Sequence, residues 1–316
     1  MVQNFVINAV VNYIMTNILI SIIGPTAIGK TALSIKLAQY FDTEILSADS
    51  RQFYKEMSIG TAAPTPTELA SAKHHCIHHK SVIDNYTVGD FENEAITILD
   101  DIFKSKNIAI MVGGSGLYVD AVTKGLDKFP KVDSSIRLSL NERLNSEGIT
   151  SLQEQLKILD QKAYNSIAID NPHRLIRALE ICIGTNKPYS SFLTSTNKTR
   201  NFKTITIGLT AERTIIYDRI NLRVDQMITE GLLDEVKQLE SMQDLNALNT
   251  VGYKELFRYL NDEWTLEFAI SEIKKNTRRF AKRQLTWFKK NTETLWYDYL
   301  TEPGVIISDI KKKINA

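Results

Sequence analysis

The stretch NILISIIGPTAIGKT, residues 17–31, decides the fold of this chain. Its first seven residues are an apolar, β-rich run, and the pattern G-x-x-x-x-G-K-S/T follows at residues 24–31. Apolar residues then recur at helical spacing over residues 30–41. Strand, glycine-rich loop and helix in this order are the context that a phosphate-binding loop requires.

The expected phosphate loop offers three kinds of group to an anion. Its backbone N–H groups and the start of the following helix favour negative charge, Lys30 adds a point charge, and the Thr31 hydroxyl suits Mg²⁺. We therefore expect a phosphate or diphosphate to bind along the loop, which consists of Gly24, Pro25, Thr26, Ala27, Ile28, Gly29, Lys30 and Thr31.

Further strands are predicted at residues 43–50, 107–114 and 202–209. The second of these is a continuous apolar run, which is typical of a buried parallel strand. Strands that alternate with helices predict an α/β fold. The expected form is a phosphate-loop (P-loop NTPase-like) parallel sheet, with the site at the carboxyl ends of its strands.

The strand signal disappears in the middle of the chain, where consecutive short helices are expected. One of them has Asn171 as its N-cap, Pro172 at its first position and Gly184 as its stop. A strand pattern follows this helical block, so the block is predicted to be an insertion. The expected domains are a catalytic core with C-terminal helices, 17–127 and 201–316, and a small helical domain, 128–200.

Length and composition are those of a soluble globular enzyme, with 316 residues of which 43% are hydrophobic and 24% charged. The two cysteines, Cys76 and Cys182, make no disulfide framework, which favours a reducing cytoplasm. Residues 1–16 are apolar but interrupted by asparagines. We expect them to be a dispensable extension rather than a membrane segment, and the protein to be a monomer.

The acid that a nucleoside triphosphatase needs is not evident. Such enzymes hold their metal with an Asp at the end of an apolar strand. The segment ITILDD, residues 96–101, resembles this pattern, but its apolar residues fall on a helix face and leave Asp100 and Asp101 solvated. The buried strand at 108–112 ends instead in GGSGLY, and Asp49 follows the second predicted strand. Taken alone, an Asp at the end of a strand is a helix cap or turn residue about as often as it is a functional residue.

A set of motifs in this order resembles the tRNA dimethylallyltransferase (tRNA isopentenyltransferase) family in its bacterial form. The motifs are GPTAIGKT, ADSRQFY, MSIGTAAP, VGDFENEA, VGGSGLY, NPHRLIRALEI, DRINLRVDQMITEGLLDEV, TVGYKEL and AKRQLTWF. The resemblance implies transfer of the dimethylallyl group of dimethylallyl diphosphate to N6 of the adenosine on the 3′ side of the anticodon. It also implies a phosphate-loop core with a helical insertion that grips the anticodon stem-loop of tRNA.

The catalytic site that the resemblance implies centres on Asp49, as the base that takes the proton of the adenine amine. The departing diphosphate gains charge in the transition state and needs donors aimed at it. The loop amides, Lys30, Mg²⁺ on Thr31, and one or both of Arg219 and Arg223 are expected to supply them. The two arginines share a helix face because they are four residues apart.

Other positions are expected to contact tRNA. By the resemblance these are Asp49, Ser50, Arg51, Gln52, Ser115, Arg137, His173, Arg174, Leu175, Ile176 and Arg177. Ser115 stands where the family usually has Thr and keeps the hydroxyl, which is expected to bond to substrate. Ala63 stands where Lys is common, which removes a charge. The stretch 274–290 has eight Lys or Arg and no acid, which suggests further phosphate contacts.

Some alternatives remain open. The segment KHHCIHHK gathers four of the five histidines with Cys76, yet neighbouring side chains of an extended segment point to opposite sides, so a zinc site is not expected. Competing functions are an adenylate isopentenyltransferase that acts on AMP, a phosphate-loop small-molecule kinase, and a non-catalytic RNA-binding protein. The helical insertion and the basic stretches favour RNA over a mononucleotide. The missing strand-end acid argues against the kinase, and Asp49 with an intact phosphate loop argues against a non-catalytic protein.

Overall fold

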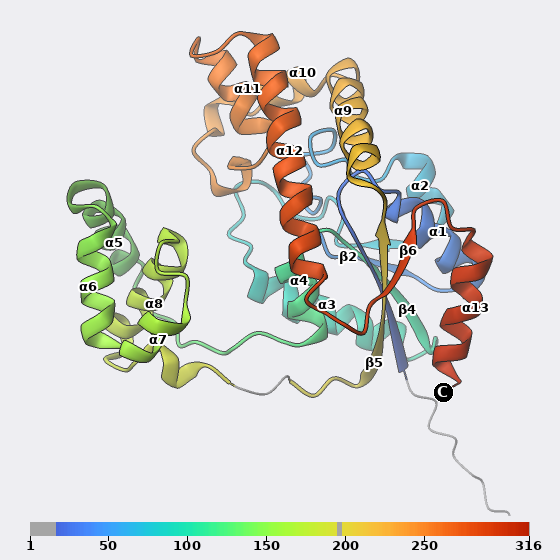
Figure 1. Cartoon of the computed structure of the whole chain (residues 1–316), viewed down its shortest axis with the longest axis horizontal. Helices are drawn as coiled ribbons and strands as arrows, with labels where there is room; N and C mark the ends of the chain where they lie inside the picture. The colour runs from blue at the N-terminus through green and yellow to red at the C-terminus, as the bar shows by residue number, and fades with distance from the viewer. Residues whose placement is uncertain (1–16, 195–197, 316) are drawn as a thin grey trace, which may run out of the picture. The chain divides into compact units, whose positions relative to one another are not determined.

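The computed structural model describes residues 17–194 and 198–315, and the chain divides into two compact units. The α/β unit contains the described residues up to Lys124 and from Arg200 onward, and the helical unit runs from Gly125 to Thr199. Figure 1 shows the elements of both units with their labels. The limits of the helical unit are close to those expected for the insertion. The extension predicted at residues 1–16 lies outside the described residues.

Within the described residues, the α/β unit is built on a six-stranded sheet in the order β3-β2-β4-β1-β5-β6, and all neighbouring strands are parallel. The strands are β1 (Asn17–Ile23), β2 (Ile45–Ser47), β3 (His74–His75), β4 (Ile108–Val112), β5 (Phe202–Thr210) and β6 (Leu295–Asp298). The predicted α/β fold is confirmed, and β1, β2, β4 and β5 correspond to the four predicted strands. The short strands β3 and β6 at the two edges were not predicted.

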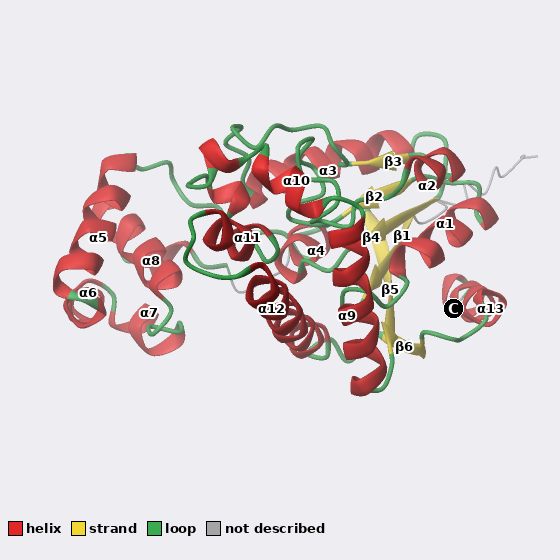
Figure 2. Cartoon of the chain, turned by 90° about the horizontal axis from the view of Figure 1, so that it is seen from above, coloured by secondary structure: helices red, strands yellow, loops and turns green. Residues whose placement is uncertain are grey.

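The apolar run of β1 is buried on both faces of the sheet. Ile18, Ile20 and Ile22 pack into one hydrophobic cluster, and Leu19 and Ile23 into another. Helices α1 (Lys30–Tyr40) and α13 (Pro303–Ile314) cover the first face, whereas α3 (Val88–Ile102) and α4 (Gly116–Thr123) cover the second, as Figure 2 shows. β1 pairs with β4 on one side and with β5 on the other. The phosphate loop that follows β1 therefore lies in the middle of the row formed by the carboxyl ends of the strands.

The four α-helices between β5 and β6 contact one another. A third hydrophobic cluster joins the C-terminal helices to residues 53–57, which follow β2. No helix of the described residues is long and apolar enough to cross a membrane. The remaining helices are α2 (Pro66–Ser71), α9 (Arg213–Thr229), α10 (Leu232–Lys237), α11 (Tyr253–Leu260) and α12 (Leu266–Phe288), with 3-10 turns η2 (Glu240–Met242) and η3 (Asn246–Leu248).

The helical unit has its own apolar core. The predicted start of its last α-helix is confirmed, because Asn171 caps the helix through its side chain and Pro172 takes the first position. The predicted stop at Gly184 is wrong. The helix continues to Thr185 and ends at Asn186, a residue type that tolerates the left-handed φ of 52° found there. The elements are α5 (Ser134–Glu147), α6 (Ile149–Leu159), α7 (Gln161–Ser166), α8 (Pro172–Thr185) and the 3-10 turn η1 (Tyr189–Phe192).

Candidate active site

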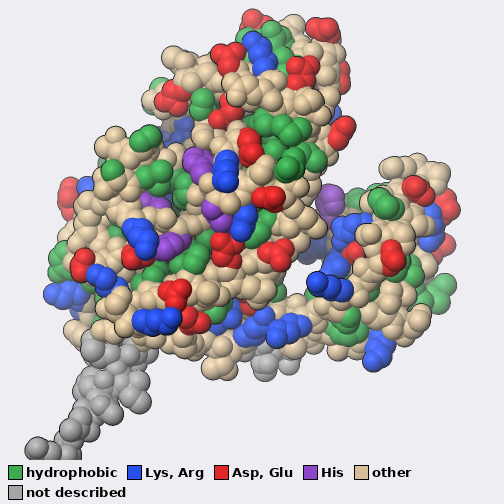
Figure 3. Space-filling model, turned by 180° about the vertical axis from the view of Figure 1, so that it is seen from behind, with side chains coloured by type: hydrophobic (Ala, Val, Ile, Leu, Met, Phe, Trp, Pro, Cys, Tyr) green, Lys and Arg blue, Asp and Glu red, His purple; other side chains and the backbone are tan. Residues whose placement is uncertain are grey.

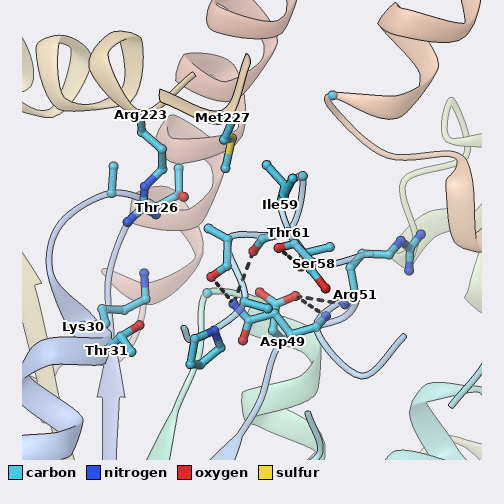
Figure 4. Close-up of a pocket in the computed structure, with 18 of the residues that line it drawn as sticks. Thr26, Lys30, Thr31, Asp49, Arg51, Ser58, Ile59, Thr61, Arg223 and Met227 are labelled. Atoms are coloured by element: carbon cyan, nitrogen blue, oxygen red, sulfur yellow. Dashed lines mark hydrogen bonds between the residues drawn. The ribbon is translucent and has the colours of Figure 1, made fainter. Parts of the chain in front are cut away.

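A cavity of about 890 Å³ lies at the carboxyl ends of β1, β2 and β4. Its walls come from the phosphate loop, from the segments after β2 and β4, and from helices α9 and α12. Figure 4 shows Lys30, Thr31 and Arg223 on one side of this space and Asp49 on the other. The parallel sheet therefore brings the predicted phosphate site and the predicted base to one cavity.

The phosphate loop reaches the cavity over residues 26–31. It turns into α1 through Gly29, whose φ of 106° is in the left-handed region that favours glycine. Gly24 and Pro25 do not line the cavity, and their contact with a diphosphate stays a prediction. Proline has no N–H to offer an anion, and the Pro25 carbonyl oxygen instead accepts a hydrogen bond from Lys30 Nζ at 2.7 Å. Gly24 lies so close to β5 that a Cβ there would be 2.5 Å from the carbonyl oxygen of Leu209.

Cationic side chains gather around the phosphate loop. Burial and then the charge of Arg223 lower the pKa of Lys30 to about 7, and Asp49 opposes this change. Burial and then the charge of Arg219 lower the pKa of Arg223, which lines the cavity. Arg219 does not line the cavity, and its Nε donates to the carbonyl oxygen of Ala27 at 2.8 Å. Lys30 and Arg223 are both partly buried, and their positive charges repel each other. A bound anion such as diphosphate would relieve this repulsion, so the electrostatics on this side of the cavity favour an anion.

Asp49 follows β2 and lies across the cavity from Lys30 and Arg223, which we call the cationic wall (Figure 4). Its Oδ1 accepts hydrogen bonds from the backbone N–H groups of Arg51 at 2.9 Å and Gln52 at 3.3 Å. Its Oδ2 makes no hydrogen bond within the described residues. Burial raises the pKa of Asp49, although the two N–H groups and Lys30 act in the opposite direction. A fixed carboxylate with one available oxygen is suited to accept a proton.

The loop after β4 packs directly on the segment after β2. A Cβ at Gly113 would lie 2.2 Å from the carbonyl oxygen of Ala48, so this contact requires glycine. The Ser115 hydroxyl accepts a hydrogen bond from the backbone N–H of Ser50 at 3.0 Å and donates to the Ser50 hydroxyl at 3.1 Å. Ser115 therefore joins the two strand ends beside the cavity. Its bond to substrate stays a prediction.

The side chains of Arg51 and Gln52 line the cavity and also support its walls. Gln52 Nε2 donates to the carbonyl oxygens of Thr61 at 3.3 Å and Ala62 at 3.1 Å. Arg51 Nη2 donates to the carbonyl oxygen of Asn246 in η3 at 3.2 Å. These supporting contacts were not predicted, and the contact of both residues with tRNA stays a prediction.

Gln284 on α12 is a site residue that the sequence analysis missed. Its buried side chain accepts a hydrogen bond at Oε1 from the Thr26 N–H at 2.9 Å and donates from Nε2 to the Gly114 carbonyl oxygen at 2.8 Å. One amide thus ties the phosphate loop to the loop after β4. Gln284 is one of several uncharged polar residues inside the basic stretch, and nothing in the sequence singled it out.

The structure confirms that ITILDD is helical and that no acid ends β4. The segment lies in α3, where Asp100 and Asp101 are exposed. The Thr31 hydroxyl, expected to hold Mg²⁺, lines the cavity and makes no hydrogen bond within the described residues. Mg²⁺ retains several waters and binds substrate phosphates with few protein ligands, so this hydroxyl beside a diphosphate fits the ion.

Two predicted RNA contacts of the helical unit form ion pairs within it. Arg137 Nη2 lies 2.6 Å, and Arg177 Nη1 2.9 Å, from Glu180 Oε2. The spacing of Arg177 and Glu180, three residues apart on one helix, could have indicated the second pair. One carboxylate serves both arginines, so it compensates only part of their charge, and their contact with tRNA phosphate stays a prediction.

The other predicted contacts of α8 differ in exposure. His173 and Arg174 are exposed and available to a partner. Leu175 and Ile176 are 0% and 3% exposed, because they pack in the core of the helical unit. The prediction that Leu175 and Ile176 contact tRNA through their side chains is therefore wrong.

The basic stretch 274–290 lies mostly on α12, and its charges are only partly uncompensated. Lys274 Nζ is 2.6 Å from Asp225 Oδ1, and Lys275 pairs with Glu272. Three of the remaining cations are exposed on α12 and have no ion pair within the described residues. They are Arg279, Lys282 and Arg283.

The histidine-rich segment is tied to acidic side chains, and Figure 3 shows histidines at the surface among acidic and basic groups. His75 Nε2 lies 2.6 Å from Glu44 Oε2, and His79 Nε2 lies 2.9 Å from Glu94 Oε1. The chain also brings ligand atoms of Cys76, His79 and Glu94 within 4.8 Å of one another, a grouping that was not predicted. Glu94 already contacts a lysine and a tyrosine, so its oxygens have other partners.

Comparisons with known proteins show the family to which this chain is similar. A model of the IPP transferase family matches residues 52–291. A protein named tRNA dimethylallyltransferase from Christiangramia forsetii is 60% identical over 302 residues, which cover 96% of this chain and 100% of that protein. Its namesake from Flavobacterium psychrophilum is 56% identical over 305 residues, with 95% and 99% covered.

Solved structures show the same relationship. The full-length tRNA isopentenylpyrophosphate transferase from Bacillus halodurans has a TM-score of 0.70 at 38% identity, with 94% of this chain and 96% of that chain covered. A eukaryotic dimethylallyltransferase, solved acting on tRNA, has a TM-score of 0.74 at 28% identity, with 90% and 74% covered. The family match extends over more than half of the chain, and the two bacterial relatives align along nearly their whole length. This chain belongs to the IPP transferase family.

Proposed function

We propose that this protein transfers the dimethylallyl group of dimethylallyl diphosphate to N6 of the adenosine on the 3′ side of the anticodon in tRNA. The observation that carries the proposal is one cavity that holds both a cationic phosphate loop and the Asp49 carboxylate, while β4 ends without an acid. The names of the relatives, and a solved neighbour that acts on tRNA, support the same substrates.

The reaction requires a base because adenine N6 is a poor nucleophile, its lone pair being delocalised into the ring. A bond forms between N6 and C1 of the dimethylallyl group, and the bond between C1 and the diphosphate oxygen breaks. The diphosphate leaves with the electron pair of that bond, and the N6 proton passes to Asp49. The two N–H groups that hold Oδ1 orient Oδ2 for this transfer.

The cationic wall would bind the diphosphate and stabilise the charge that develops on it. The N–H groups at the start of α1, Lys30 and Arg223 face this part of the cavity. The pKa of Lys30 rises when an anion binds, so the loop gains positive charge as its ligand arrives. Thr31 would hold Mg²⁺, which would neutralise part of the remaining charge of the diphosphate.

The tRNA would be held mainly through its phosphates. The exposed cations Arg279, Lys282 and Arg283 on α12, and Arg174 on α8, are the proposed contacts. The target adenosine must leave its stack for N6 to reach Asp49, so we expect a flipped base.

One assay tests the proposal. The protein is incubated with Mg²⁺, dimethylallyl diphosphate and unmodified tRNA, and the digested tRNA is searched by mass for isopentenyladenosine. Parallel reactions replace the tRNA by AMP, or the donor by ATP. Product on AMP but not on tRNA would favour an adenylate isopentenyltransferase, and phosphoryl transfer from ATP would favour a kinase.

A further inference from the structure

Glu235 on α10 accepts an unusual set of hydrogen bonds from the loop after β2. Its Oε2 accepts from the backbone N–H groups of Ser58 at 2.9 Å and Ile59 at 2.8 Å. Its Oε1 accepts from the Gly60 N–H at 2.9 Å and from the Tyr253 hydroxyl at 2.6 Å. Three successive N–H groups directed at one anion form a nest, and here the anion is a side chain of the protein.

The ring of Tyr253 supports the same loop. Tyr253 is 0% exposed, and a Cβ at Gly60 would lie 2.5 Å from its ring, so only glycine lets the loop rest there. Burial and the neighbouring Glu235 carboxylate both raise the pKa of Tyr253, so its hydroxyl stays protonated and donates to Glu235. The loop is therefore held by the Glu235 carboxylate and rests on the Tyr253 ring. Both residues come from segments far from the loop in the sequence.

The next residues of the loop are held by a different segment. Gln52 donates to the carbonyl oxygens of Thr61 and Ala62, and it sits three residues after Asp49 on the same segment. Residues 58–63 all line the cavity, as does Asp49. Figure 4 shows Ser58, Ile59 and Thr61 beside Asp49. The loop is thus a wall of the reaction space, anchored by Glu235 at one end and by Gln52 at the other.

We infer that Glu235 is a positioning residue for group transfer, because its carboxylate fixes residues 58–60 as the wall that holds the reacting groups against Asp49. The inference rests on the proposed function and adds to it a residue outside the cavity. Glu235 does not line the cavity, so it acts only through the loop. The phosphate loop is tied separately through Gln284, so we expect donor binding not to depend on this anchor.

The test compares Glu235→Gln with two other variants. Gln presents an NH₂ group to N–H donors, so part of the nest loses its acceptor. We expect kcat to fall about 10²-fold, as for a displacement of reacting groups by about 1 Å. The donor KM and the affinity and stoichiometry of pyrophosphate binding should stay within a few-fold of the wild type. Tyr253→Phe removes one of the four bonds and should give a smaller fall in kcat.

Asp160→Asn is the matched control. Asp160 is also a buried carboxylate that accepts from backbone N–H groups, of Ala163 at 2.9 Å and Ser190 at 2.6 Å, and neither it nor these partners line the cavity. This variant should lower the melting temperature and leave kcat per folded molecule unchanged. The amides of residues 58–60 should exchange faster with solvent in Glu235→Gln and not in Asp160→Asn.

The inference is overturned if Glu235→Gln keeps the wild-type kcat while losing stability as Asp160→Asn does, since Glu235 would then be structural only. Unchanged exchange of the amides of residues 58–60 would overturn it as well. A wild-type protein that transfers no group to tRNA contradicts the proposed function instead, and the exchange measurement still reports on the anchor in that case.

Discussion

Asp49→Asn separates the catalytic from the structural role of this side chain. The structure shows that the carboxylate has two tasks on two different oxygens. Oδ1 accepts hydrogen bonds from the N–H groups of Arg51 and Gln52, and Oδ2 makes no hydrogen bond within the described residues. The carbonyl oxygen of Asn can take both bonds of Oδ1, so the turn after β2 should keep its shape. The variant then lacks only a group that can accept a proton at neutral pH.

The expected effect follows from this division. Loss of a general base lowers kcat by roughly 10²–10⁴, which corresponds to about 3–5 kcal/mol of transition-state stabilisation. The fold should tolerate the change to within about 1 kcal/mol, since Asn and Asp serve almost equally well as local caps. The affinities for donor and tRNA should change only a few-fold.

Single-turnover transfer to an unmodified anticodon stem-loop measures the chemical step directly. Asp101→Asn is the control, because it removes an exposed carboxylate that pairs only with Lys104 in the structure. The wild-type rate should rise with pH through the pKa of Asp49, which burial raises above that of an ordinary aspartate. This acid limb should be missing in Asp49→Asn. Near-normal turnover by Asp49→Asn would refute the assignment and leave the structural role alone.

Further predictions concern the cationic wall, its support and the tRNA surface. Lys30, with its pKa of about 7, should take up a proton when pyrophosphate binds at pH 8 and none below pH 6; calorimetry in buffers of different ionisation enthalpy, with Lys30→Met as control, measures this uptake. Gln284→Leu should lower the free energy of unfolding by about 2–4 kcal/mol in urea denaturation and weaken pyrophosphate binding, because it leaves the Thr26 N–H and the Gly114 carbonyl unpaired. Replacing Lys282 and Arg283 by Ala should flatten the salt dependence of stem-loop binding by about one unit for each phosphate that the protein no longer neutralises, and an unchanged slope would contradict their role. Transfer should need no nucleoside triphosphate, and ATP hydrolysis coupled to turnover would contradict this.

Local signals in the sequence were sufficient for the core of the fold. The strands β1 and β4 are runs of mainly apolar residues, and burial of β1 on both faces requires such a run. The phosphate loop was predictable because its glycines and lysine have fixed positions relative to a strand and a helix. The edge strands β3 and β6 have two and four residues and carry no comparable pattern.

The supports of the site could not be predicted, because they join segments that are far apart in the chain. Gln284 bonds to Thr26 from 258 residues away, and Glu235 bonds to Ser58 from 177 residues away. Each bond joins a side chain to a backbone N–H group, and such groups occur at every residue except proline. Neither spacing nor periodicity marks them. The ion pairs of Arg137 and Arg177 with Glu180 were not predicted either, since a positive charge in the sequence does not indicate which acid lies beside it in the fold.

The order of the strands explains why a phosphate loop can serve group transfer here. On one side of β1 lies β4, and it ends in glycines that let the segment after β2 pack against it. The Asp49 carboxylate follows β2, two strands away from β1. Neighbouring strands lie about 4.8 Å apart, so this places the start of the Asp49 segment roughly 10 Å from that of the phosphate loop. Such a gap between the two backbone segments leaves room for a five-carbon group between a bound diphosphate and the base. An acid at the end of β4 would stand next to the phosphate loop, whereas the acid after β2 leaves a space between itself and the loop, where we propose that the acceptor amine arrives.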